Sequence, residues 1–162
     1  MKSLPKCLVL AVALIAGCAG NPFATGIQAG STRDQVISRM GRPARTVPLP
    51  GGERLQFSGQ PFGQWAFMVD LDSSGRVTQS RQVLTANEFD RIETGKWTRE
   101  DVEREFGRPA KVDHVWSWHG PIMTYRWYGV SDMFYHVYLD ERGVVQRAHP
   151  AMEFLNAPTE RI

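Results

Sequence analysis

Hydrophobic and polar positions follow nearly the same pattern in two stretches of this chain, 66 residues apart. The first runs Thr-Arg-Asp-Gln-Val from Thr32 and reaches Gly-Arg-Pro-Ala at Gly41. The second runs Thr-Arg-Glu-Asp-Val from Thr98 and reaches Gly-Arg-Pro-Ala at Gly107. So many matching Thr, Val, Gly and Pro positions predict one structural unit that is used twice.

Each stretch predicts a short helix with a defined start and end. Thr32 and Thr98 are good N-caps, because a threonine hydroxyl can accept a bond from a free N–H of the first turn. Apolar side chains then recur at i and i+4 on one helical face, as Val36 with Met40 and Val102 with Phe106. Glycine followed closely by proline ends each helix. A shorter helix is predicted over 86–92, with a less distinct counterpart near 22–27.

Alternating apolar and polar residues after each helix predict antiparallel strands. They cover 54–58, 64–71 and 77–84 in the first unit, and 111–117, 123–128, 133–139 and 144–148 in the second. The predicted fold class is α+β, with two tandem helix-helix-antiparallel-sheet units. Whether the two sheets join into one continuous sheet stays open.

The N-terminal region predicts export and lipidation. Lys2 and Lys6 precede an apolar run over 8–15, which has the length of a signal peptide. Ile-Ala-Gly-Cys, ending at Cys18, resembles the lipobox of bacterial lipoproteins, so Cys18 is the predicted lipidation site. The alternative is an ordinary secretory signal with a chance cysteine. Ala19 stands where an aspartate would indicate inner-membrane retention, which favours the periplasmic face of the outer membrane.

The predicted organisation is a signal peptide (1–17), a lipidated tether (18–25), repeat one (26–85), repeat two (86–149) and a tail (150–162). Loss of Lys2 and Lys6 from the 19 basic residues leaves 17 against 17 acidic ones. A mature chain without net charge gives no support for nucleic-acid binding. Because Cys7 leaves with the signal and Cys18 carries lipid, no disulfide is predicted.

The recurring frame also resembles a known family. Ile-x-x-Gly-x-Thr-Arg-x-x-Val from Ile27 and a one-residue-longer version from Ile92, each followed by Gly-Arg-Pro, resemble the BamE (SmpA/OmlA) lipoprotein family. The resemblance implies two helices on a small antiparallel sheet and an accessory role in inserting β-barrels into the outer membrane. That family typically has one copy of the unit. Two copies resemble the β-lactamase inhibitor protein, in which a continuous curved sheet grips an enzyme.

The sequence does not predict an enzyme, a metal site or a cofactor. It has no Gly-x-Ser-x-Gly elbow, no phosphate-binding glycine loop and no His-Glu-x-x-His motif. Asp113 and His114 are adjacent, but no nucleophile accompanies them. The histidines lack the spacing of metal ligands: His114, His119, His136 and His149.

Aromatic residues concentrate in the second half, with eleven over 86–149 against five over 19–85. If Tyr135, Val137 and Leu139 face the helices, the residues between them face the other side of the sheet. Aromatic and histidine side chains on one face are typical of protein interfaces. The predicted partner-binding residues are Trp116, Trp118, Phe134, His136 and Tyr138. The alternatives are an aromatic-rich core, or a face covered by the first repeat or the tail.

The sequence therefore predicts a non-enzymatic, lipid-anchored protein that acts as a binding accessory or scaffold in the envelope. Its expected partner is an envelope protein, and the family resemblance adds the outer-membrane barrel-assembly machine as a candidate. The alternative is an inhibitor of a periplasmic enzyme. Membrane contact is expected through the N-terminal lipid.

Overall fold

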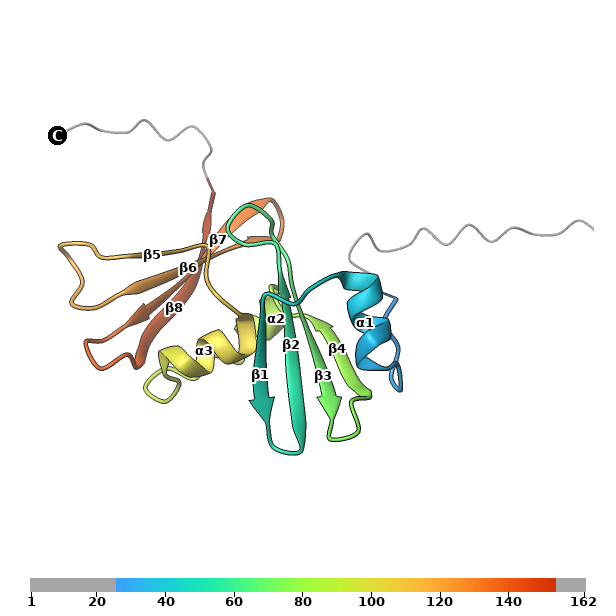
Figure 1. Ribbon diagram of the computed structural model, residues 1–162. Helices are drawn as coiled ribbons and strands as arrows, with labels where there is room; N and C mark the ends of the chain where they lie inside the picture. Colours follow the sequence, from blue (N-terminus) through green and yellow to red (C-terminus); the bar gives the residue numbers. More distant parts are fainter. Residues whose placement is uncertain (1–25, 154–162) are drawn as a thin grey trace, which may run out of the picture.

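The computed structural model describes residues 26–153, which form an α+β structure of three short helices and two four-stranded antiparallel sheets (Figure 1). The helices are α1 (Arg33–Met40), α2 (Ala86–Phe89) and α3 (Arg99–Phe106). The first sheet holds β1 (Arg45–Leu49), β2 (Gly52–Ser58), β3 (Ala66–Asp72) and β4 (Val77–Gln82). The second holds β5 (Lys111–Asp113), β6 (Ile122–Tyr128), β7 (Asp132–Leu139) and β8 (Val145–Met152). The predicted signal peptide, Cys18 and residues 154–162 lie outside the described part.

Both predicted N-caps are confirmed as reciprocal capping boxes. Thr32 N donates to Gln35 Oε1 at 2.8 Å, and Gln35 N donates to Thr32 Oγ1 at 3.3 Å. Thr98 and Asp101 make the same two bonds at 2.8 and 3.3 Å. The glycines that end the helices have positive φ values of 80° and 79°, at Gly41 and Gly107. No helix among residues 26–153 is long and apolar enough to cross a membrane.

The two sheets repeat one architecture. Their strand orders are β1-β2-β3-β4 and β5-β6-β7-β8, with every neighbouring pair antiparallel. Each has an irregularity at the same place between its last two strands, at Asp70/Leu71 and at Tyr138/Leu139. Matching strand order and matching irregularities, 68 residues apart, show two similar units in tandem.

The sequence-based prediction missed one strand and misplaced the ends of two others by several residues. Strand β1 was not predicted, because Pro48 interrupts the pattern; proline is tolerated here since β1 is an edge strand. The strand predicted over 111–117 ends at Asp113, and a loop over 114–121 carries Trp116 and Trp118. The last strand continues to Met152, past the predicted end at 148.

The two sheets do not join, because helices lie between them. In Figure 1, α1 lies on one side of the first sheet, while α2 and α3 lie between the first sheet and the second. One core packs α1 on the first sheet and includes Val36, Leu55, Phe57, Phe67, Val69, Leu71 and Val77. A second core runs from the first sheet through α2 and α3 to the second sheet and includes Met68, Phe89, Phe106, Tyr125 and Val137. The layers are therefore helix, sheet, helices, sheet.

Buried polar contacts fix α3 on the first sheet. Arg54, which is 5% exposed, binds both carboxylate oxygens of Asp70 at 2.6 and 2.8 Å. Its Nη1 lies 2.9 Å from Glu105 and donates to the Arg104 carbonyl at 3.1 Å. Gln56 Nε2 donates to the same carbonyl at 3.0 Å. The hydrogen bond to Asp70 is the main cause of a raised Arg54 pKa.

Replacing Arg54 with alanine should lower the free energy of unfolding by about 3–5 kcal/mol, because Asp70, whose side chain is only 14% exposed, would lose the cation that pairs with it. Urea denaturation followed by tryptophan fluorescence measures this change. The control is Arg33→Ala, since the ion pair of Arg33 with Glu53 is 43% and 31% exposed and should contribute about 1 kcal/mol at most. Equal losses in the two variants would contradict the expectation.

Candidate functional site

The outer face of the second sheet carries a contiguous group of aromatic and basic side chains. In β7, Tyr135, Val137 and Leu139 are buried in the core with α2 and α3. The intervening side chains of β7 are half-buried and lie on the opposite face, as predicted. We call this surface the aromatic–basic face; it consists of Lys111, Trp118, Phe134, His136, Tyr138, Arg147 and His149.

The strand register aligns these residues in rows across the sheet. One row contains Lys111, Thr124, His136 and His149, and the next contains Asp113, Ile122, Tyr138 and Arg147. Directly opposite residues on one face bring their Cβ atoms to about 4.5–5.5 Å. Large side chains in neighbouring rows therefore touch, and they cover Ile122 and Thr124, both of which are buried.

Ring contacts join the members of the face. Tyr138 lies 5.3 Å from Trp118 in an edge-to-face arrangement and 5.4 Å from His149 in a stacked one, between ring centroids. The ring of His136 lies 5.8 Å from His149 and 5.8 Å from Phe134. Offset and edge-to-face pairs at these distances are favourable, so the rings form one ordered strip.

The two predicted tryptophans behave differently. Trp118 Nε1 donates to the carbonyl of Leu139 at 2.7 Å, which ties the 114–121 loop to the end of β7. Trp116, two residues earlier, is fully exposed. The prediction that both lie on one face of a strand is wrong, because β5 ends at Asp113 and both tryptophans lie in the loop that follows it.

Cations surround the rings. The Arg147 guanidinium lies 3.9 Å above the centre of the Tyr138 ring and 5.7 Å from that of Trp118. Lys111 Nζ lies 5.8 Å from the Phe134 ring and 2.9 Å from Asp113. Cation–π contacts of this kind contribute about 0.5–1 kcal/mol at exposed sites.

Sequence reasoning did not include Lys111, Arg147 or His149 in the site. Arg147 and His149 pair directly with Tyr138 and His136 across β7 and β8. Lys111 lies in the same row as His136, with one strand between them. The turn at Gly143 sets the pairing of β8 with β7, and this pairing would have placed Arg147 beside Tyr138 and His149 beside His136.

His136 is held in its neutral form. Burial is the main cause that lowers its pKa below the ordinary 6.5, and repulsion from His149 and Lys111 adds to it, while Asp113 opposes it. Its Nδ1 lies 3.0 Å from the buried hydroxyl of Thr124. The face therefore disfavours an additional positive charge in its centre.

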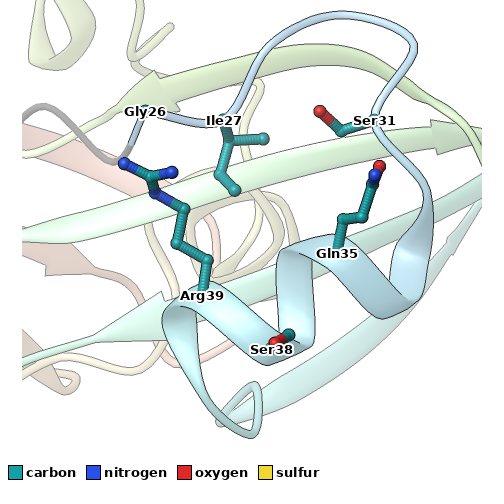
Figure 2. A pocket seen from close by; sticks show the side chains of 6 residues that line it. All are labelled: Gly26, Ile27, Ser31, Gln35, Ser38 and Arg39. Carbon is teal, nitrogen blue, oxygen red and sulfur yellow. The ribbon is translucent and has the colours of Figure 1, made fainter.

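Two hollows elsewhere on the surface lack the arrangement of a catalytic site. Figure 2 shows the first, between α1 and the segment before it, lined by Gly26, Ile27, Ser31, Gln35, Ser38 and Arg39. None of these six can act as a general base at neutral pH. No group of three or more His, Cys, Asp or Glu side chains in residues 26–153 is placed to hold a metal ion.

The second hollow brings Ser117, His119 and Asp140 together beside Trp118. Asp140 serves the β7–β8 turn, since its Oδ1 accepts from the amides of Arg142 and Val144 at 2.9 Å each. The bond to Val144 is the main cause of a lowered Asp140 pKa. No hydrogen bond among the described residues links the serine to the histidine, so the three side chains do not form a triad.

No family model and no curated protein match this chain. It is similar to the crystal structure of a DUF4309 family protein, YjgB, from Bacillus subtilis subsp. subtilis str. 168, with 16% sequence identity and a TM-score of 0.33. The similarity covers 76% of this chain and 79% of that one. At this TM-score it carries no inference about role.

The resemblance to the BamE (SmpA/OmlA) family is therefore corrected, because no family model matches this chain. The residues behind the resemblance are local signals. Thr32 and Thr98 cap helices, and Gly41 and Gly107 end them, so many unrelated helix-strand units could share them. The likeness to the β-lactamase inhibitor architecture is also wrong, since the sheets are separate.

We expect His136 to titrate below pH 6.5 in an NMR titration of its ring protons. As the pH falls, His136 takes up a proton in the unfolded chain before it does so in the folded protein. The contribution of neutral His136 to the free energy of unfolding is therefore fully present above pH 6.5, and it is lost as the pH falls toward the folded-state pKa. Lys111→Gln should raise the His136 pKa by removing one repelling charge. Arg142→Gln, which removes an exposed cation outside the face, should leave the value unchanged. A wild-type pKa at or above 6.5 would contradict the expectation.

Proposed function

We propose that this chain is a non-enzymatic accessory or scaffold protein of the bacterial envelope that binds another protein through its aromatic–basic face. The observation that carries this proposal is a sheet face on which Phe134, His136 and Tyr138 follow one another along β7 and Trp118 packs on Tyr138. None of the described helices covers this face (Figure 1). Binding energy at protein interfaces is concentrated in tryptophan, tyrosine and arginine.

The physical state of the rings supports this function. Trp118 is fixed by its hydrogen bond to Leu139, and Tyr138 is held between Trp118 and His149. Rings that are already ordered lose little conformational entropy when a partner covers them. The same rings are half-exposed in the free protein, so covering them releases apolar surface from water.

We also propose that lipid on Cys18 anchors the protein to the outer membrane, where it faces the periplasm. The support is in the sequence: a basic start, an apolar run and Ala-Gly before the cysteine, with Ala19 after it. Two or more acyl chains are sufficient for stable anchoring. Within this proposal, residues 19–25 connect the lipid to the folded units.

A second candidate is an inhibitor that covers a periplasmic enzyme. The fully exposed ring of Trp116, on the loop beside the face, supports it, because a projecting side chain can enter an active-site cleft. The barrel-assembly machine was suggested by the family resemblance, and without that resemblance no observation favours it over other envelope proteins.

A photo-crosslinking amino acid in place of Tyr138 should capture a specific envelope protein in intact cells. The same amino acid in place of Ser73, which is exposed in the turn between β3 and β4 of the first sheet, is the control and should not capture it. Trp118→Ala should reduce capture by about tenfold or more, as expected for a hot-spot residue. Circular dichroism of the purified variant checks that it still folds.

Equal capture from positions 73 and 138 would refute the face as the binding site. A captured hydrolase whose activity falls in proportion to added protein would favour the inhibitor. A captured protein without such inhibition favours the scaffold.

Cys18→Ala should abolish incorporation of radiolabelled palmitate and move the protein from the membrane fraction to the soluble fraction. The reason is that the lipid is the proposed anchor, and no helix in residues 26–153 is long and apolar enough to cross a membrane. Cys7→Ala is the matched control and should retain the label, because Cys7 lies in the predicted signal peptide. Undiminished labelling of the Cys18 variant would refute the anchor.

A further inference from the structure

The face of the first sheet that corresponds to the aromatic–basic face is already covered, and α3 covers it. Gln56 on that face donates to the carbonyls of Glu103 and Arg104 in α3 at 2.9 and 3.0 Å. Arg54 beside it is 5% exposed, and Met68 is buried in the core shared with α3. A helix is thus seated on this type of face within the molecule itself.

The two faces correspond position by position. The matching cross-strand pairs are Arg54–Asp70 with Ile122–Tyr138, Met68–Arg81 with His136–His149, and Arg45–Gln56 with Lys111–Thr124. The irregularity next to Tyr138 also matches the one next to Asp70. The second sheet therefore offers a helix a surface with the same strand order and register.

Negative charge is what α2 and α3 bring to the first sheet. Three of their five carboxylates meet an arginine of the sheet: Glu103 with Arg45 at 3.3 Å, Glu105 with Arg54 at 2.9 Å, and Glu88 with Arg81 at 2.7 Å. Charge-assisted hydrogen bonds are about twice as strong as neutral ones. The seating of the helix layer on this sheet is therefore electrostatic as well as apolar.

The aromatic–basic face carries two cations, Lys111 and Arg147, and no helix carboxylate meets them. Lys111 stands at the position of Arg45, whereas the positions of Arg54 and Arg81 hold Ile122 and His149. Arg147 makes no ion pair within residues 26–153, and its guanidinium lies over Tyr138. The carboxylate that meets Lys111 comes from Asp113 on the same strand.

We propose that the partner docks an acidic amphipathic helix on the aromatic–basic face, in the way that α3 docks on the first sheet. This inference rests on the proposed function and specifies the kind of partner. The carboxylates of the helix meet Lys111 and Arg147, and its apolar side chains cover Phe134 and Tyr138. The arrangement would extend the observed alternation of sheet and helix layers by one helix.

Neither a second copy of the chain nor its own C-terminal segment has the required chemistry. In α1, Ile37 and Arg39 stand where α3 has Glu103 and Glu105, so a second copy would bring a cation to a cationic face. Residues 154–162 contain one acidic side chain, directly before Arg161, and a proline in mid-segment disfavours a helix.

The test uses the full mature chain and a helix-stapled peptide with the α3 sequence Arg99–Phe106, because α3 is the helix that the corresponding face binds. A matched peptide has its Glu residues replaced by Gln and its Asp by Asn. In NMR titrations, the acidic peptide should shift signals of Phe134, His136 and Tyr138. This amide peptide keeps Arg99 and Arg104 and is therefore cationic. It should bind about tenfold or more weakly, since it lacks the charge-assisted bonds and is repelled by the cations of the face.

Protein variants test the same contacts from the other side. Lys111→Gln with Arg147→Gln should weaken the acidic peptide by about tenfold or more, and added salt should do the same. The matched control, Arg108→Gln with Arg142→Gln, removes two exposed cations outside the face and should leave the affinity unchanged. Equal affinity for both peptides, or shifts confined to other surfaces, would overturn the proposal.

Three further outcomes would overturn it in favour of another occupant. Tighter binding of a short oligothymidylate than of the peptide would indicate a nucleic acid. Self-association that the Lys111/Arg147 variant abolishes would indicate a second copy of the chain. Tighter peptide binding after deletion of residues 154–162 would indicate that the C-terminal segment occupies the face. Capture from position 138 by a partner segment that is neither acidic nor helical would refute this inference and leave the proposed function standing. If the acidic peptide binds the face but no envelope protein is captured in cells, the proposed function is refuted, while the preference of the face for an acidic helix stands.

Discussion

The structure depends on one helix layer, α2 and α3, which packs against both sheets at once. On one side, Phe89 stacks on Tyr135 of the second sheet at 3.9 Å between ring centroids and packs on Phe106 of α3. On the other side, the same layer presents carboxylates to the arginines of the first sheet, with Glu105 on Arg54. Because the layer occupies the space between the sheets, their strands cannot pair, and two separate four-stranded sheets result.

The two sides of this layer differ in what they contribute. The aromatic side removes a large apolar area from water, which is the main favourable term in folding. The charged side costs desolvation of Arg54 and its carboxylates, so it adds little net stability. The charged contacts do fix one orientation of α3 on the first sheet. The Arg54 guanidinium donates to both carboxylate oxygens of Asp70 in the sheet and to the carbonyl of Arg104 in α3.

Local signals in the sequence predicted the parts of the fold that depend on neighbours along the chain. The caps at Thr32 and Thr98 need only residues three positions away, and the alternation in β7 needs only a period of two. The separation of the sheets could not be predicted in this way. It depends on bonds such as Gln56 to Glu103, which join residues 47 positions apart in the chain. The position of Trp118 likewise depends on a distant carbonyl, that of Leu139.

The different chemistry of the two corresponding faces follows from how each is covered. The first sheet is attached to α3 by a short chain segment, so its face is covered at high effective concentration and can hold a buried arginine that needs a partner. The second face must remain stable without a cover. There, Tyr138 stands in place of Asp70 and Ile122 in place of Arg54, while Arg147 lies over the Tyr138 ring with its charge in water. Half-exposed rings and cations whose charges reach water leave no buried polar group without a hydrogen-bond partner when the face is free. The same side chains can contact a helix that docks on the face.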